Sequence, residues 1–146
     1  MSRVEAPVRS DYHQWETQTT RWVDNDAYGH VNNAVYYTYI DSVVNSYMIQ
    51  RGGLDPSSSD IIGVVVESWC HYRTSFTYPE PVEAGLRVWN LGGSSVKYEV
   101  GMFRQGEDTA AVWGGFVHVF VDRHHRKPVP IPDKIRACLK QLLVEL

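Results

Sequence analysis

The sequence predicts an α+β protein in which a curved antiparallel sheet of about five strands wraps around one long central helix, with a second helix at the C-terminus. Two observations predict this class. One helical segment is apolar around most of its circumference, and four strand-like segments then follow one another with no helix between them. Because antiparallel strands need no crossover helices, the long helix is free to lie across one face of the sheet.

The composition is typical of one globular domain. The chain has 146 residues, of which 43% are hydrophobic and 12% aromatic, so it can bury a sizeable core. The formal charge is −3 and the one basic run is at 123–127, which argues against a nucleic-acid partner. Cys70 and Cys138 lie far apart in the sequence and form no metal-type pair, as is typical of a reducing compartment.

No segment resembles a signal peptide, and no run of apolar residues is long enough to span a membrane. We therefore expect a single cytoplasmic domain over residues 1–146, with no membrane partner and with residues 1–11 as a flexible tail. Residues 12–23 are rich in Thr, Trp and Tyr, which predicts a first strand.

Residues 32–50 predict the central helix. Their polar side chains recur at helical spacing and form one narrow stripe: Thr38, Asp41, Ser42, Asn45 and Ser46. An ordinary surface helix has a broad polar face instead. We therefore expect other parts of the protein to surround this helix.

A loop with a Gly pair and a Pro follows at 50–60. The remaining chain predicts four strands, at 61–76, 83–92, 94–104 and 109–122. An extended exit at 124–132 and an amphipathic helix at 133–146 follow them.

The segment "WVDNDAYGHVNNAVYY" (22–37) concentrates polar residues directly before the helix. As a calcium loop it fails, because Tyr28 and Val35 stand where ligands are required. A phosphotransfer aspartate is not supported by a preceding buried strand or a following Thr or Ser. A metal site from Asp24, Asp26 and His30 lacks a further ligand cluster.

A third interpretation uses more of these residues. Gly29 permits a sharp turn, and Asn32 or Asn33 can cap the helix. The helix N-terminus then offers free N–H groups to a developing oxyanion, and Asp26 is close enough to attack a carbonyl or activate water. The alternative is that Asp26 only forms the turn and His30 only makes local hydrogen bonds.

Residues 21–41, "RWVDNDAYGHVNNAVYYTYID", closely resemble the signature of hotdog-fold acyl-CoA thioesterases of the 4-hydroxybenzoyl-CoA thioesterase type. Residues 86–103 resemble that family's central strand pair, and 122–132 resemble its closing strand and exit. The resemblance implies a hotdog fold and hydrolysis of a fatty or aromatic acyl-CoA to free acid and CoA. An acyl-carrier-protein thioesterase, a hydratase or dehydratase of the same fold, and a non-catalytic acyl-CoA-binding module are the alternatives.

By this resemblance Asp26 is the catalytic carboxylate, acting as nucleophile or general base. The thioester carbonyl is held by a backbone N–H near Asn33, and His30 orients Asp26, orders water or braces the loop. Trp22 stands where the family sometimes has Tyr, so it brings no hydroxyl. No metal or redox cofactor is expected, and coenzyme A enters as part of the substrate.

The resemblance also implies a homodimer or homotetramer with sheets paired edge to edge and active sites at the subunit contact. Tyr98 or Trp113 on an exposed sheet face would support further packing. Cys70 is expected to be a buried, inert thiol. The expected substrate-binding residues are Gly29, Val31, Tyr36, Arg73, Ser94, Ser95 and Lys97.

Overall fold

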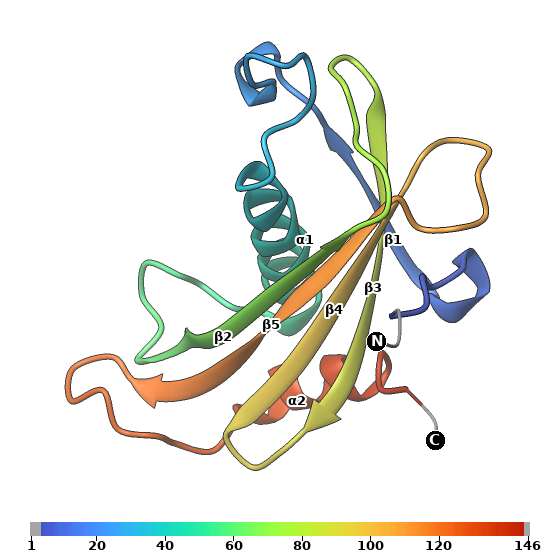
Figure 1. Cartoon of the computed structure of the whole chain (residues 1–146). Helices are drawn as coiled ribbons and strands as arrows, with labels where there is room; N and C mark the ends of the chain where they lie inside the picture. The colour runs from blue at the N-terminus through green and yellow to red at the C-terminus, as the bar shows by residue number, and fades with distance from the viewer. Residues whose placement is uncertain (1–3, 145–146) are drawn as a thin grey trace.

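The computed structural model describes residues 4–144, which form one five-stranded antiparallel sheet and two α-helices (Figure 1). The strand order is β1-β3-β4-β5-β2, and every neighbouring pair is antiparallel. The elements are β1 (Gln14–Thr19), α1 (Val35–Gly52), β2 (Ile61–Tyr72), β3 (Pro81–Leu91), β4 (Ser95–Phe103), β5 (Val112–Asp122) and α2 (Asp133–Lys140). Two 3-10 turns, η1 (Arg9–Asp11) and η2 (Trp22–Asp24), flank β1. The predicted fold class is confirmed.

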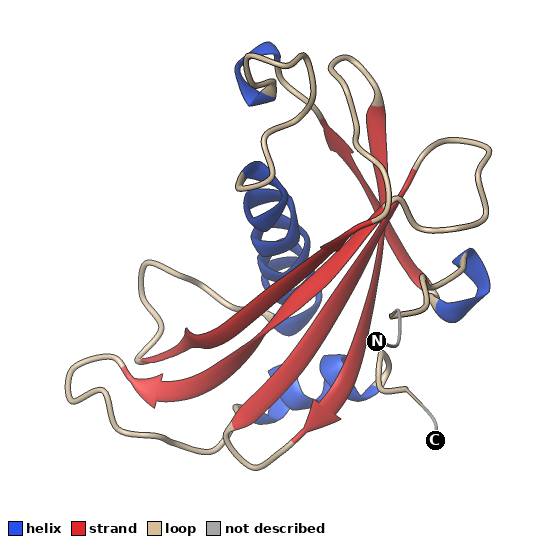
Figure 2. Cartoon of the chain, in the orientation of Figure 1, coloured by secondary structure: helices blue, strands red, loops and turns tan. Residues whose placement is uncertain are grey.

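Helix α1 lies along the concave face of the sheet, which curves around it (Figure 2). Most of its apolar side chains are buried, whereas Tyr37 and Ile49 are exposed together with Thr38, Asp41 and Ser42 of the polar stripe. The helix ends at Gly53, which has φ of 67° and donates its N–H to the Met48 carbonyl. The polar stripe of residues 32–50 is therefore narrow because the sheet surrounds much of the helix.

The outer face of the sheet is covered in part by the N-terminal segment. The ring of Tyr12 lies over Gly85 and Gly101, where an added Cβ would come within 2.6 Å of it. Its hydroxyl donates to Glu99 at 2.7 Å. Strand β4 is therefore buried on both faces over most of its length.

Part of the segment that we expected to be a flexible tail contacts the rest of the molecule, at residues 8–11. The Arg9 N–H donates to the Asp108 carbonyl at 3.0 Å, and its guanidinium forms an ion pair with Glu83 at 2.7 Å. The expected tail residues 1–3 lie outside the described residues.

Tyr98 and Trp113 do not offer the exposed packing surface that we expected. Tyr98 is 0% exposed and faces α1, where its hydroxyl lies 3.4 Å from the Met48 sulfur. Trp113 is 6% exposed and packs with Tyr12 and Phe103 on the outer face. Helix α1 therefore covers Tyr98 on one face of the sheet, and the N-terminal segment covers Trp113 on the other.

The C-terminal helix is shorter than predicted, because α2 ends at Lys140. The chain then runs beside β3, where the Val144 N–H donates to the Val88 carbonyl at 2.8 Å and Leu143 forms a parallel bridge. Residues 142–144 thus occupy the part of the β3 edge that β1 leaves open. The part of residues 133–146 beyond 144 lies outside the described range.

His118 lies in the core, 3% exposed, with its Nδ1 3.3 Å from the Tyr98 hydroxyl. Burial lowers the pKa of this imidazole to about 4, whereas an unfolded chain binds the proton near its ordinary pKa of about 6.5. The unfolded state therefore holds more protons between these values. At pH values above its unfolded pKa, His118 does not affect the free energy of unfolding. As the pH falls from that value toward the folded pKa, the free energy of unfolding decreases.

As the pH falls from the unfolded pKa of His118 to its folded pKa, we expect this side chain to lower the free energy of unfolding by about 3 kcal/mol. His118→Gln should flatten that part of the pH profile, as measured by urea unfolding at a series of pH values. Equal slopes for the wild type and the variant would contradict this role.

Candidate active site

The segment between β1 and α1 forms a closed loop. The Asp26 N–H donates to the His30 carbonyl at 2.8 Å, and the Asn32 N–H donates to the Asp24 carbonyl at 2.9 Å. Gly29 has φ of 82°, a left-handed conformation that favours glycine, and its N–H donates to the Asp26 carbonyl. The loop therefore returns Asp26 to the vicinity of the residues that begin α1.

Asp26 lines an open cavity of about 530 Å³ beside Trp22 and Val23. Its Oδ1 accepts the Tyr28 N–H at 2.8 Å and makes a longer contact of 3.5 Å with the His30 N–H. The recorded contacts of His30 with Asp26 thus run through its backbone rather than its imidazole. The Asp26 carboxylate is held in place on one side and borders open space.

Asp24 has a different role, because its side chain is fully buried. It accepts hydrogen bonds from the Tyr39 hydroxyl at 2.6 Å and from the backbone and guanidinium of Arg21 at 2.8 to 3.1 Å. Burial opposes its ionisation, but the hydrogen bonds from Tyr39 and Arg21 outweigh this and lower the pKa of the carboxyl. Burial and the neighbouring Asp24 raise the pKa of Tyr39. This cluster ties the loop to α1.

The start of α1 presents backbone donors. Asn32 Oδ1 accepts the Ala34 N–H at 2.9 Å, and the Asn32 carbonyl accepts the Val35 N–H at 2.9 Å. The Asn33 carbonyl accepts the Tyr72 hydroxyl at 3.1 Å. Within residues 4–144 the Asn33 N–H has no recorded hydrogen-bond acceptor. This exposed residue therefore leaves one donor available at the positive end of the helix.

Some expected substrate-binding residues lie behind this site rather than on its surface. Val31 is 3% exposed and donates its N–H to the Phe76 carbonyl. Tyr36 is 1% exposed, and its hydroxyl accepts the Phe76 N–H at 3.0 Å. Both residues position the loop and the helix start from the core.

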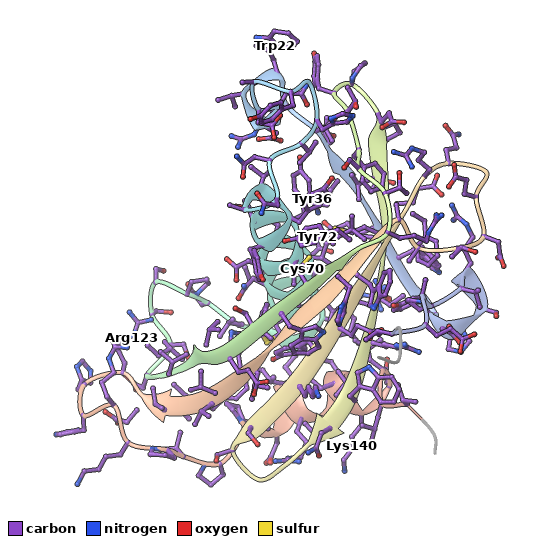
Figure 3. The ribbon with its side chains drawn as sticks, in the orientation of Figure 1. Trp22, Tyr36, Cys70, Tyr72, Arg123 and Lys140 are labelled. Atoms are coloured by element: carbon purple, nitrogen blue, oxygen red, sulfur yellow. The ribbon has the colours of Figure 1, made fainter. Side chains whose placement is uncertain are left out.

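The side chains gather as Figure 3 shows, with Trp22 at the outer end of the molecule and Tyr36, Tyr72 and Cys70 together near α1. Trp22 is 76% exposed and contacts Tyr78 edge to face. Burial raises the pKa of the Cys70 thiol, so it is a poor nucleophile at neutral pH.

The expected CoA contacts fall into two groups. Arg73, next to Tyr72, donates to the Ala110 carbonyl at 2.8 Å and lies 3.5 Å from Glu107. Ser94 directly precedes β4, and Ser95 and Lys97 lie near its start, at the other end of the sheet from the loop before α1 (Figure 1). The structure does not bring this second group to Asp26 within one chain.

Sequence reasoning missed a groove between α1 and the edge strand β2. It has a volume of about 460 Å³ and is lined by Tyr37, Thr38, Asp41, Val65, Ser68 and Phe116. Beside it, Val65 and Val66 are 51% and 61% exposed. The valines of this edge strand were the feature of the sequence that could have indicated an apolar groove here.

A sheet wrapped around a central helix, with a carboxylate on the loop at the helix start, defines the hotdog thioesterase class. Residues 20–139 match the model of the thioesterase-like superfamily, and the chain belongs to this family. It is a thioester hydrolase. A comparison with curated proteins finds no match.

Solved structures agree with this assignment. The PA5185 protein of Pseudomonas aeruginosa is 47% identical, with a TM-score of 0.93 over 94% of this chain and 96% of that chain. The PA2801 protein of the same organism is 29% identical, with a TM-score of 0.78 over 84% and 95%. The structure of BH1999 gentisyl-coenzyme A thioesterase is 20% identical, with a TM-score of 0.76 over 86% and 99%, a likeness of fold alone.

Within residues 4–144, no group of three or more His, Cys, Asp and Glu side chains is arranged to hold a metal ion. No helix in the same range combines the length and apolar character needed to cross a membrane.

Stability measurements should distinguish the structural role of Asp24 from the role of Asp26. We expect Asp24→Ala to lower the free energy of unfolding by about 2–4 kcal/mol, because it leaves the Tyr39 hydroxyl and the Arg21 guanidinium without their acceptor. Asp26→Asn should change it by less than about 0.5 kcal/mol. Urea unfolding measures both, and equal losses would contradict the division of roles.

Proposed function

We propose that this thioesterase hydrolyses an acyl-CoA, with Asp26 as nucleophile or general base and the Asn33 N–H as oxyanion donor. The observation that carries the proposal is a carboxylate bordering an open cavity, on a loop that returns to a helix start with an unused N–H. A donor placed there stabilises the charge that develops on the carbonyl oxygen. The helix dipole adds to this effect.

Two routes fit these groups. In the first, Asp26 attacks the thioester carbon, and the CoA thiolate leaves and takes a proton from a water molecule. The hydroxide that remains then hydrolyses the mixed anhydride and frees Asp26. In the second, Asp26 removes a proton from water as that water attacks the carbon, and the tetrahedral intermediate then expels the CoA thiolate, which takes the proton from Asp26. Both routes return Asp26 as a carboxylate and release acid and thiol.

A CoA substrate is supported by the fold likeness to BH1999, which is described as a gentisyl-coenzyme A thioesterase. An acyl-carrier protein is acidic and would need a cationic surface near the site. The nearby Arg21 is committed to Asp24. A non-catalytic acyl-CoA-binding module would bind the ligand without releasing thiol.

We further propose that the active form is a homodimer, or a tetramer built from it, joined through β2. This edge carries the exposed Val65 and Val66 and borders the groove along α1. A twofold axis that pairs two β2 strands antiparallel reverses one sheet relative to the other. The partner's β3–β4 turn then lies toward the Asp26 loop, which would unite the two separated groups of CoA contacts.

Asp26→Asn should lower the rate of thiol release by about 10² to 10⁴-fold, since the amide can neither attack nor accept a proton. A panel of acyl-CoAs with a thiol reagent measures this. The variant should still bind the substrate. An absence of turnover in the wild type, with binding intact, would instead identify a binding module.

His30→Ala is the matched control on the same loop. Its side chain makes no recorded contact with Asp26, so it should lower turnover less than Asp26→Asn does. The reverse ranking would make His30 the principal base.

Val66→Lys should weaken dimerisation and thiol release together, because it places a charge on the proposed contact edge. Sedimentation velocity and the thiol assay measure the two effects. Leu143→Lys, a substitution of an exposed apolar residue beside β3, should change neither. A fully active monomer would refute the shared site.

A further inference from the structure

Strand β1 is the second open edge of the sheet. It pairs with β3 over six unbroken positions, from Gln14–Leu86 to Thr19–Pro81, and no other strand within residues 4–144 pairs with it. Alternate residues of such a strand turn their N–H and C=O groups outward. β1 contains no proline, lysine or bulge, which are common devices for blocking an edge.

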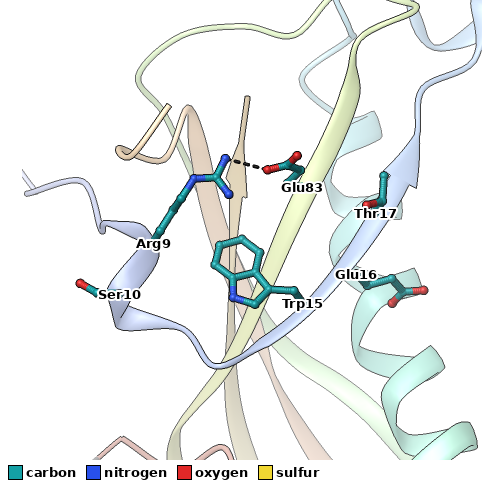
Figure 4. Close-up of a pocket in the computed structure, with 6 residues that line it drawn as sticks. All are labelled: Arg9, Ser10, Trp15, Glu16, Thr17 and Glu83. Carbon is teal, nitrogen blue, oxygen red and sulfur yellow. Dashed lines mark ion pairs between the residues drawn. The ribbon is translucent and has the colours of Figure 1, made fainter. Parts of the chain in front are cut away.

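Cavities lie on both sides of β1. The outer one has a volume of about 570 Å³ and is lined by Arg9, Ser10, Trp15, Glu16, Thr17 and Glu83 (Figure 4). The inner one, between β1 and α1, has a volume of about 270 Å³, and its polar lining includes Gln14, Glu16, Ser46 and Gln50. Successive residues of an added strand point to opposite faces. Their side chains would therefore enter the outer and inner cavities in turn.

In the outer cavity Arg9 and Glu83 compensate each other, and Trp15 forms an aromatic wall. Arg9 is paired with Glu83 at 2.7 Å, and its guanidinium lies 5.4 Å from the centre of the Trp15 ring. Trp15 is 37% exposed and packs against Phe103. An apolar side chain fits beside this ring.

The inner cavity carries an uncompensated negative charge. The recorded partner of the Glu16 carboxylate is the Ser46 hydroxyl, which donates to Oε1 at 3.1 Å. Within residues 4–144, no salt bridge involves Glu16. A lysine or arginine side chain would complement it.

We propose that the β1 edge binds an extended segment of a partner protein in which a basic residue alternates with an apolar one. The segment's backbone pairs with β1, its cation meets Glu16, and its apolar side chain packs beside Trp15. A second copy of this chain fits less well, because antiparallel self-pairing brings two Glu16 carboxylates near each other. β1 lies at the opposite edge of the sheet from β2, so this surface stays open in the proposed dimer.

The test uses the full chain and a blocked hexapeptide of alternating valine and lysine. Amides in 14–19 should gain protection from hydrogen exchange on peptide addition, and titration should give a saturable affinity. Glu16→Gln should weaken that affinity at least fivefold, whereas Glu5→Gln, at an exposed carboxylate away from β1, should not. A valine–glutamate peptide, and a valine–lysine peptide with every backbone amide methylated, should not bind.

Several results would overturn the proposal: no binding of the valine–lysine peptide, unchanged affinity in Glu16→Gln, or protection that falls on β2 instead of β1. Protection of β1 that grows with protein concentration alone would assign the edge to a second copy. Thiol release by Glu16→Gln should equal that of the wild type, which shows that the variant is folded. The peptide titration and the hydrogen-exchange readout do not depend on the acyl-CoA substrate.

Discussion

The buried carboxylate of Asp24 is the contact on which the arrangement of the site depends. It joins the loop to α1 through Tyr39 and closes the η2 turn through Arg21. Because its hydrogen bonds outweigh the cost of burial, the carboxyl stays ionised and the loop has one preferred position. Asp26 needs no comparable partners, because the loop around it is already fixed by Asp24 and by the Asp26–His30 backbone bond. One aspartate thus provides structure and leaves the other free for chemistry.

The two faces of the sheet are built by different means. The inner face packs against α1, which buries most of its apolar side chains there and exposes much of its narrow polar stripe. Within residues 4–144 the outer face has no α-helix along it and is covered in part by Tyr12, whose ring takes the space above Gly85 and Gly101. Both edges of the sheet remain open within the described chain, and they differ in character: β2 is rich in exposed valine, whereas β1 is polar and flanked by cavities.

Much of this fold could be predicted from local patterns. The reversed polarity of residues 32–50 requires an enclosing sheet, and turn residues separate the later strands. The contacts of Arg9 and Tyr12 could not be predicted, because they join segments far apart in the sequence and follow no periodicity. The same limit explains why Tyr98 and Trp113 were expected on an exposed face.

The site was predictable only in outline. The sequence places two aspartates before a helix, but burial, which spacing does not reveal, decides that Asp24 is structural. Lys97 and Arg73 were both expected to bind substrate, yet Lys97 pairs with Val117 within the sheet, whereas Arg73 follows β2 and donates to the Ala110 carbonyl. Their relation depends on how two subunits meet, and residue patterns within one chain do not encode that directly.

The most direct test of the central claim is a crystal structure with an acyl-CoA analogue in which a methylene group replaces the thioester sulfur. The account predicts that the analogue's carbonyl oxygen lies about 3 Å from the Asn33 nitrogen. It also predicts that a carboxylate oxygen of Asp26 lies about 3–3.5 Å from the carbonyl carbon, or reaches it through one water. A carbonyl bound away from the start of α1, with Asp26 facing neither it nor a bridging water, would contradict the account.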